Sequence, residues 1–206
     1  TCVLLQYGGG SIKKSGLYDR VVQAVREAGI ELYEIGGVQP NPRLSLVKQG
    51  VELCKKEGVD FVLAIGGGSA IDSSKAIAYG LANDFDLEDL FLGKVSTTKI
   101  AKIGAISTLA GTGSETSNST VINIDTMGEK MLKRSYNHEC ARPLFAIMNP
   151  ELTYSLPPFQ TAAPGADIMM HTMERYFTTE QHVELSDELA EGLMRTVKTF
   201  VPEALA

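Results

Sequence analysis

The chain has 206 residues, of which 44% are hydrophobic, enough for one full domain of about 100–150 residues and part of a second. Asp and Glu outnumber Lys and Arg by 25 to 19, which gives a formal net charge of −6. This balance argues against nucleic acid or an anionic membrane as the main partner, and no apolar run approaches the roughly 20 residues that span a bilayer.

Strands and helices alternate along the first half of the chain. Apolar strands are expected at residues 3–7, 31–35 and 61–65, and segments with a helical apolar period follow them at 17–28, 44–57 and 69–82. This alternation predicts a parallel sheet covered by helices. Further strands are expected at 101–107, 121–124, 131–135 and 145–148, with a turn at 127–129.

The pattern changes at Pro157-Pro158, where no further strands follow and helices are expected at 159–178 and 183–205. We therefore predict a dinucleotide-binding α/β domain over residues 1–156 and the first helices of a helical domain over 157–206. The sequence opens inside an expected strand without an initiator Met and stops inside a helical pattern, so we expect a fragment.

The cysteines, Cys2, Cys54 and Cys140, are odd in number and lack C-x-x-C spacing. Such cysteines predict a reduced, cytoplasmic protein in which the thiols are buried apolar groups rather than nucleophiles.

The most informative segment is 61–75, where an apolar strand passes through Gly66-Gly67-Gly68 into a helix that begins near Ser69. Bare glycine backbone and the unpaired N–H groups of a helix N-terminus form a site for a phosphate or diphosphate. The alternative is an ordinary strand–turn–helix in which Ser69 and Asp72 form a capping box.

Two other turns rich in Gly and Ser follow strands, at 7–16 and 107–116. Ligands of open α/β sheets bind beyond the carboxyl ends of the strands, so three such turns predict one extended cleft for a dinucleotide. The alternative is three flexible connections. Gly9, Gly10, Ser11, Lys13 and Lys14 in the first turn offer donors and positive charge without a carboxylate, which favours NADP(H) over NAD(H).

Asp167 and His171 stand four residues apart in the expected helix 159–178, so their side chains share a face. A carboxylate and an imidazole in this arrangement could hold one divalent ion. Spacing alone favours an ordinary surface pair, because a catalytic metal site needs at least a third ligand.

These motifs together resemble the iron-containing, group III alcohol dehydrogenases. The segments 66–75, 108–115, 149–158 and 165–174 match that family in the same order, and the opening 7–17 is similar to its butanol dehydrogenase branch, whose members often use NADPH. The resemblance implies a Rossmann-like domain followed by an all-helical metal-binding domain. It also implies that two further histidine ligands lie beyond the end of this chain, so the fragment is expected to bind metal weakly and to be inactive alone.

The resemblance further assigns roles to individual residues. Asp167 and His171 become the first two ligands of Fe²⁺ or Zn²⁺. The coenzyme-binding residues implied by the match are Gly9, Gly10, Ser11, Asn41, Gly67, Gly68, Ser69, Asp72, Thr108, Leu109, Thr112, Ser114, Lys130, Tyr154 and Leu156.

The implied function is metal-dependent hydride transfer between NADP(H) and a small alcohol or aldehyde. A homodimer is an expectation from the family resemblance alone. A glycerol dehydrogenase or dehydroquinate synthase-like enzyme of the same superfamily stays open as an alternative. So does a nucleotide-binding module without chemistry.

Overall fold

The computed structural model describes residues 1–125 and 131–206 and divides into two compact units. The first unit comprises residues 1–108 and 113–149, and the second comprises 109–112 and 150–206. The main division therefore falls between Asn149 and Pro150, before the predicted boundary at residue 156, because the turn at 150–153 belongs with the helices that follow it.

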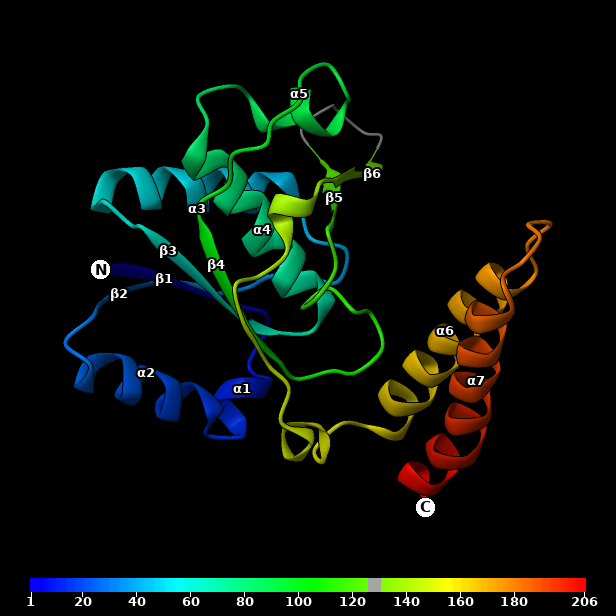
Figure 1. Ribbon diagram of the computed structural model, residues 1–206. Helices are drawn as coiled ribbons and strands as arrows, with labels where there is room; N and C mark the ends of the chain where they lie inside the picture. The colour runs from blue at the N-terminus through cyan, green and yellow to red at the C-terminus, as the bar shows by residue number, and fades with distance from the viewer. Residues whose placement is uncertain (126–130) are drawn as a thin grey trace. The chain divides into compact units, whose positions relative to one another are not determined.

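A five-stranded parallel sheet forms the centre of the first unit (Figure 1). Its strand order is β2-β1-β3-β4-β7. The strands are β1 (Cys2–Tyr7), β2 (Glu31–Ile35), β3 (Phe61–Gly66), β4 (Lys102–Ser107) and β7 (Ala146–Ile147). Strands β1, β3 and β4 are buried along most of their length, as expected for strands covered on both faces. The predicted parallel sheet is confirmed.

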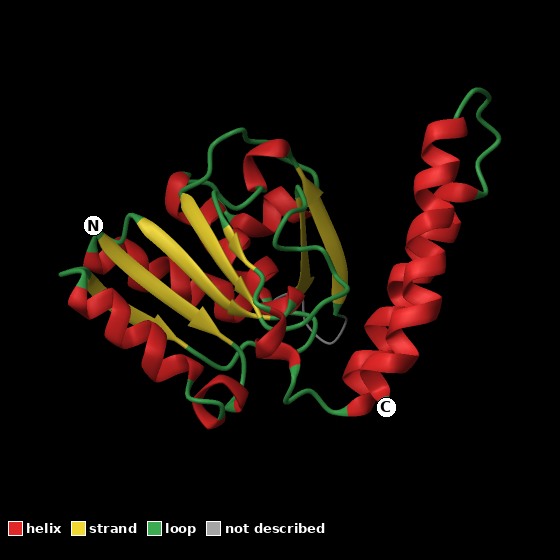
Figure 2. Cartoon of the chain, turned by 60° about the horizontal axis from the view of Figure 1, so that its bottom comes forward, coloured by secondary structure: helices red, strands yellow, loops and turns green. Residues whose placement is uncertain are grey.

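Helices cover both faces of this sheet (Figures 1 and 2). Helix α2 (Leu17–Glu27) lies on one face, and α3 (Leu44–Glu57) and α4 (Gly68–Ala82) lie on the other. The sequence did not predict α1 (Ser11–Lys14), α5 (Leu87–Phe91) or the 3-10 turn η1 (Glu139–Ala141), since each is too short to show a helical period.

Helix α4 is the most buried helix of the first unit, with most of its residues hidden from solvent. Its apolar residues pack with Leu4, Leu44 and Val62 in one core. Polar groups also join α4 to the sheet. Gln6 of β1 donates to Ser73 Oγ at 2.8 Å and accepts from Ser74 Oγ at 2.7 Å, so the buried amide is satisfied at both ends. These bonds hold the second turn of α4, at Ser73 and Ser74, against β1.

The strands β5 (Ser119–Ile124) and β6 (Leu132–Asn137) form a separate antiparallel pair. Thr120, Ile122 and Ile124 alternate toward the interior, and β5 packs on α4. The two predicted strands are confirmed, and the turn predicted at 127–129 lies outside the described residues.

The second unit consists of the 3-10 turn η2 (Pro150–Thr153) and the helices α6 (Pro158–Tyr176) and α7 (Glu184–Leu205), which pack side by side as a hairpin (Figure 1). Pro158 occupies the first turn of α6, where its missing N–H leaves no intrahelical bond unmade. The hydroxyl of Tyr176 donates to Glu191 of α7 at 2.9 Å. Within the described residues, no helix has both the length and the apolar character needed to cross a membrane.

Candidate coenzyme and metal site

The first two glycine-rich turns leave the sheet where its strand order reverses. From β1 the chain first adds β2 on one side, and it then places β3 on the other side of β1. Tyr7 at the end of β1 is paired with Ile65 of β3, so the turns after these strands begin side by side. A reversal of this kind is where open α/β sheets bind their ligands. The prediction that these turns follow the carboxyl ends of parallel strands is confirmed, and the two strands are neighbours.

The second turn joins β3 to α4 through backbone that favours glycine. Gly66 has a φ of 150°, and a Cβ added there would lie 2.8 Å from the Cβ of Ala70. Gly67 is the N-cap of α4, and no side chain of the described residues caps this helix end. The capping box considered as an alternative is therefore absent from this part of the chain. Gly68 and Ser69 follow as the first residues of α4, where uncapped N–H groups suit a phosphate.

Asn41, predicted to bind on the adenosine side, lies against this helix start. Its backbone N–H donates to Ser69 Oγ at 3.2 Å, and its side-chain oxygen accepts from Lys133 Nζ at 2.9 Å. Asn41 has a φ of 57°, a left-handed conformation that Asn tolerates better than most residues. The structure thus brings together two predicted residues that are 28 positions apart.

Asp72 is buried one turn into α4 instead of capping it. One carboxylate oxygen accepts from the backbone N–H of Val121 at 3.3 Å, and the Ser114 side chain is a further hydrogen-bond partner. The other oxygen, Oδ1, has no partner among the described residues. Burial raises the pKa of Asp72 to about 6, against the opposing effect of the nearby Lys75 ammonium. Asp72 therefore joins α4 to β5 and to the third turn.

The third turn begins beside the second. Thr108 donates its backbone N–H to the carbonyl of Gly66 at 3.1 Å, and Ser114 is buried at the far end of the turn. Between them, Leu109 and Thr112 belong to the second unit. The first unit thus assembles Thr108 and Ser114 with the predicted residues of the second turn.

The first turn presents Gly9, Gly10 and Ser11 to solvent, with Gly10 as the N-cap of α1. Lys13 lies over the rings of Tyr7 and Tyr18, with its Nζ 5.0 Å and 4.6 Å from their centroids. The ammonium is therefore held in a cation–π contact beside the turn.

Sequence analysis missed a carboxylate next to this turn. Both tyrosine hydroxyls donate to one oxygen of Glu34, each at 2.9 Å. The hydrogen bond to Glu34 is the main cause of the raised pKa of Tyr18. Glu34 escaped notice because it lies in β2, and only strand pairing brings it near the turn. Both bonds use Glu34 Oε2 and hold the carboxylate beside Tyr7 and Tyr18.

The metal candidates share a face of α6, as their spacing predicted. His171 Nε2 lies 3.6 Å from Asp167 Oδ1, and His171 Nδ1 lies 3.8 Å from a carboxylate oxygen of Glu174. Both predicted ligands are about half exposed, at 60% and 51% of the side chain. Among residues 1–125 and 131–206, no three or more His, Cys, Asp or Glu side chains are arranged so that they could hold one metal ion. The pair can supply two of the ligands that a divalent ion requires.

The remaining predicted residues are more dispersed. Tyr154 is exposed and Leu156 is half-buried, in the segment between η2 and α6 of the second unit. Lys130 lies outside the described residues.

Sequence analysis also gave no role to Lys75, although it stands three residues after Asp72 in the glycine-rich motif. The structure buries Lys75 completely.

Comparison with known proteins agrees with this fold and these motifs. Residues 1–150 match the model of the iron-containing alcohol dehydrogenases. The chain is 45% identical over 194 residues to NADH-dependent butanol dehydrogenase A of Clostridium acetobutylicum, covering 94% of this chain and 49% of that protein. It is 35% identical over 206 residues to the NADPH-dependent aldehyde reductase YqhD of Escherichia coli, covering 98% of this chain and 52% of that protein.

A solved structure shows the same architecture. The crystal structure of NADH-dependent butanol dehydrogenase A from Thermotoga maritima superposes with a TM-score of 0.92 at 40% identity, over 98% of this chain and 50% of that one. The chain belongs to the iron-containing alcohol dehydrogenase family. It spans about half the length of the relatives it matches.

Proposed function

We propose that the intact protein is a metal- and NAD(P)-dependent alcohol dehydrogenase of the butanol dehydrogenase type, acting on a small alcohol or aldehyde. The observation that carries this proposal is the pair of turns at the sheet reversal, where Gly9–Gly10 and the uncapped start of α4 lie beyond neighbouring strands. The names of the relatives support the substrate class.

The residues present fit a dinucleotide. Open space surrounds Gly9 and Gly10, where no atom would lie within 4 Å of an added Cβ, and the N–H groups at the start of α4 have no side-chain cap. The buried Oδ1 of Asp72 is an acceptor with no partner in the described chain. The N–H groups would hold the diphosphate, and Asp72 Oδ1 would orient the nucleotide by accepting a hydrogen bond from it. Bound NAD(P)H supplies the hydride in aldehyde reduction.

The pair Asp167–His171 fits one side of a divalent metal site. A carboxylate oxygen and an imidazole nitrogen are suitable ligands for Fe²⁺ or Zn²⁺. When bound, such an ion polarises the substrate oxygen as a Lewis acid. Asp167 and His171 would hold the ion on helix α6. Because two ligands do not complete such a site, the rest of the intact protein would supply the others.

For the coenzyme we propose a preference for NADP(H), based on Ser11 and the exposed backbone of the first turn. The carboxylate of Glu34 already accepts from Tyr7 and Tyr18 beside the Lys13 ammonium. Both tyrosines bond to Glu34 Oε2, and we expect this carboxylate to stay with them and not to accept from the ribose 2′-hydroxyl that distinguishes NAD(H). A preference for NAD(H) is the second candidate, because the relatives with 41–45% identity bear NADH-dependent names.

The test is an assay of NADPH- and NADH-dependent reduction of butyraldehyde by the intact protein, with metal content measured on the same sample. We expect bound Fe or Zn and turnover that a chelator removes. Metal-independent turnover would point to another dehydrogenase mechanism. Coenzyme binding without turnover on any small aldehyde would favour the non-catalytic nucleotide-binding module, and activity on a polyol alone would favour the glycerol dehydrogenase-like alternative.

A further inference from the structure

Lys75 is a fully buried cation whose three donors are all used. Its Nζ donates to the carbonyl of Ser117 at 2.8 Å, to the carbonyl of Ser119 at 2.9 Å and to Ser117 Oγ at 3.3 Å. An ammonium group has three N–H bonds and donates to all three oxygens at once. A neutral amine has two, so it can donate to both carbonyls but can keep Ser117 Oγ only as a donor to its lone pair. Lys75 thus ties helix α4 to the segment that returns from the third turn to β5.

The segment that Lys75 holds leads directly to a predicted coenzyme residue. The backbone N–H groups of Thr116 and Ser117 both donate to the carbonyl of Gly113, at 3.0 and 2.9 Å. This turn contains Ser114, whose side chain hydrogen-bonds Asp72. Lys75 therefore holds the turn at Ser117, and Asp72 holds the same turn at Ser114.

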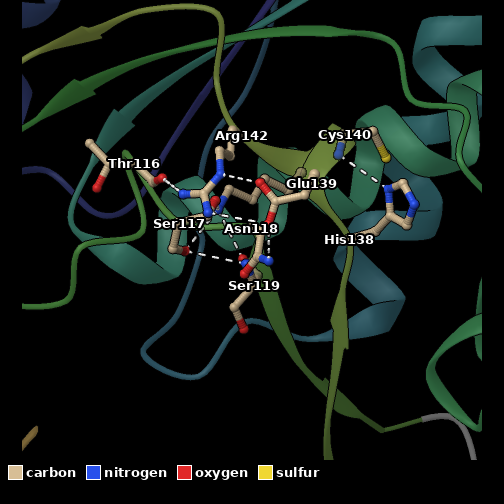
Figure 3. Close-up of polar contacts among 9 residues, drawn as sticks. Thr116, Ser117, Asn118, Ser119, His138, Glu139, Cys140 and Arg142 are labelled. Atoms are coloured by element: carbon tan, nitrogen blue, oxygen red, sulfur yellow. Dashed lines mark hydrogen bonds and ion pairs between the residues drawn. The ribbon is translucent and has the colours of Figure 1, made fainter. Parts of the chain in front are cut away.

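A second cation, Arg142, also binds this segment (Figure 3). Arg142 donates to the carbonyl of Thr116, and it forms a salt bridge of 2.7 Å with Glu139. Glu139 also accepts from the side chain of Asn118 at 2.6 Å. The successive residues 116–119 are thus bound by Lys75, Glu139 and Arg142, of which Lys75 is the buried one.

Charges of both signs act on Lys75. Asp72 on the same helix and Glu115 in the turn favour its ammonium form, while Arg142 opposes it. Burial is the largest effect and lowers the pKa of Lys75 to about 8. The ammonium is therefore the main form near neutral pH and loses its proton a little above it.

We propose that Lys75 is a positioning residue whose ammonium holds residues 113–119 in the shape that binds the coenzyme. The inference rests on the proposed coenzyme-binding function and adds to it a residue that does not touch the ligand. Deprotonation removes the positive charge that strengthens the bonds to the two carbonyls and reverses or breaks the bond to Ser117 Oγ, so the turn loosens and coenzyme affinity falls at alkaline pH.

The experiment is a fluorescence titration of the intact protein with NADPH and NADH at several pH values from about 7 to about 9. Over this range the charged fraction of a lysine with a pKa of about 8 falls from about nine-tenths to about one-tenth. If only the charged form shapes the turn, the coenzyme Kd rises by up to about tenfold. In Lys75→Met, which is never charged, we expect a Kd at pH 7 that is at least about tenfold higher than in the wild type and that lacks the rise between pH 7 and 9.

The matched control is Lys55→Met, which removes a solvent-exposed lysine of α3 that pairs with Asp84. This variant should keep the wild-type Kd and its pH profile. If Lys75→Met does not fold, Ser117→Ala serves instead. Loss of one acceptor destabilises the ammonium and should shift the midpoint of the wild-type profile to lower pH.

Two results would overturn the inference while leaving the proposed function intact: a wild-type Kd that is constant over this pH range, or a Lys75→Met variant that retains the wild-type profile. An unchanged midpoint in Ser117→Ala would also contradict it. A wild-type protein that binds neither coenzyme at pH 7 would overturn both the inference and the proposed function.

Discussion

Gly111 and Pro164 approach each other so closely that a Cβ on Gly111 would lie 2.4 Å from the Cβ of Pro164. Gly111 also has a φ of 133°, which disfavours any residue with a side chain. Pro164 lies in α6, the helix that carries Asp167 and His171. Residues 109–112 of the third glycine-rich turn belong to the second unit with α6, and Gly111 packs directly against this helix of the metal candidates.

Gly111→Ala should move the turn away from α6 and lower turnover, because the new methyl group cannot occupy the space of Pro164. We expect the unfolding free energy to fall by about 1–3 kcal/mol, measured by urea denaturation alongside kcat. The control is Gly113→Ala, where φ is 64° but no atom would lie within 4 Å of the Cβ. Equal losses of kcat in both variants would show that contact with Pro164 is unimportant.

Asp167→Ala in the intact protein should abolish metal retention and turnover, while the Kd for coenzyme changes less than about twofold. The reason is that Asp167 Oδ1 and His171 Nε2 face each other at 3.6 Å and would share one ion. Metal content by mass spectrometry and coenzyme titration provide the two readings. Asp187→Ala, on α7 of the same unit, should retain metal. Unchanged metal content in Asp167→Ala would refute the ligand assignment.

Ser11→Asp should weaken NADPH binding more than NADH binding, by about tenfold or more, through repulsion between the new carboxylate and the 2′-phosphate. The control Ser15→Asp adds the same charge just after α1, at another exposed position. Separate Kd values for the two coenzymes give the answer. Equal weakening of both in Ser11→Asp would mean that the first turn does not bind the 2′ position.

Asp72→Asn should stabilise the protein increasingly as pH rises from about 4 to about 7. The pKa of Asp72 is raised from 3.8 to about 6 by burial, so the folded state binds its proton more tightly than the unfolded state. Folding therefore loses stability as pH rises through this range, by about 3 kcal/mol in total, and the variant escapes that loss. Urea denaturation at several pH values measures the difference between the two proteins.

Asp86 should behave in the opposite way. A hydrogen bond from the backbone N–H of Glu88, followed by one from Lys48, lowers the pKa of Asp86. Its contribution to stability is therefore present above its unfolded pKa and lost as pH falls, and Asp86→Asn should destabilise most at neutral pH. The same pH dependence in both variants would contradict the assignment of Asp72 as a destabilised buried carboxylate.

Most of the fold could be predicted from local patterns in the sequence. The run of apolar residues in β3, the glycines after it and the period of α4 lie within one short segment, and the parallel sheet followed from repeats of that pattern. Short helices such as α1 and α5 give too few turns for a period to appear. Their positions depend on contacts that the sequence does not display.

Reasoning from spacing alone placed candidate site residues together where they are neighbours in sequence, and the family resemblance added distant ones such as Asn41 and Ser69. Asp167 and His171 share a helix, so their spacing was sufficient to place them on one face. Glu34 reaches the first turn through strand pairing, and Lys75 bonds to Ser119 across 44 positions. The burial of Lys75 likewise arises only when β5 packs on α4, and no sequence pattern reports it.

The most direct measurement is transfer of deuterium from NADPH carrying deuterium at both C4 positions of the nicotinamide to butyraldehyde by the intact protein, followed by mass spectrometry of the alcohol. We predict one deuterium at the alcohol carbon with wild-type protein and none above background with Asp167→Ala, which should still bind the labelled coenzyme. Unlabelled alcohol from the wild type, or equal labelling by the variant, would contradict a coenzyme-bound hydride donor acting beside a metal held by Asp167 and His171.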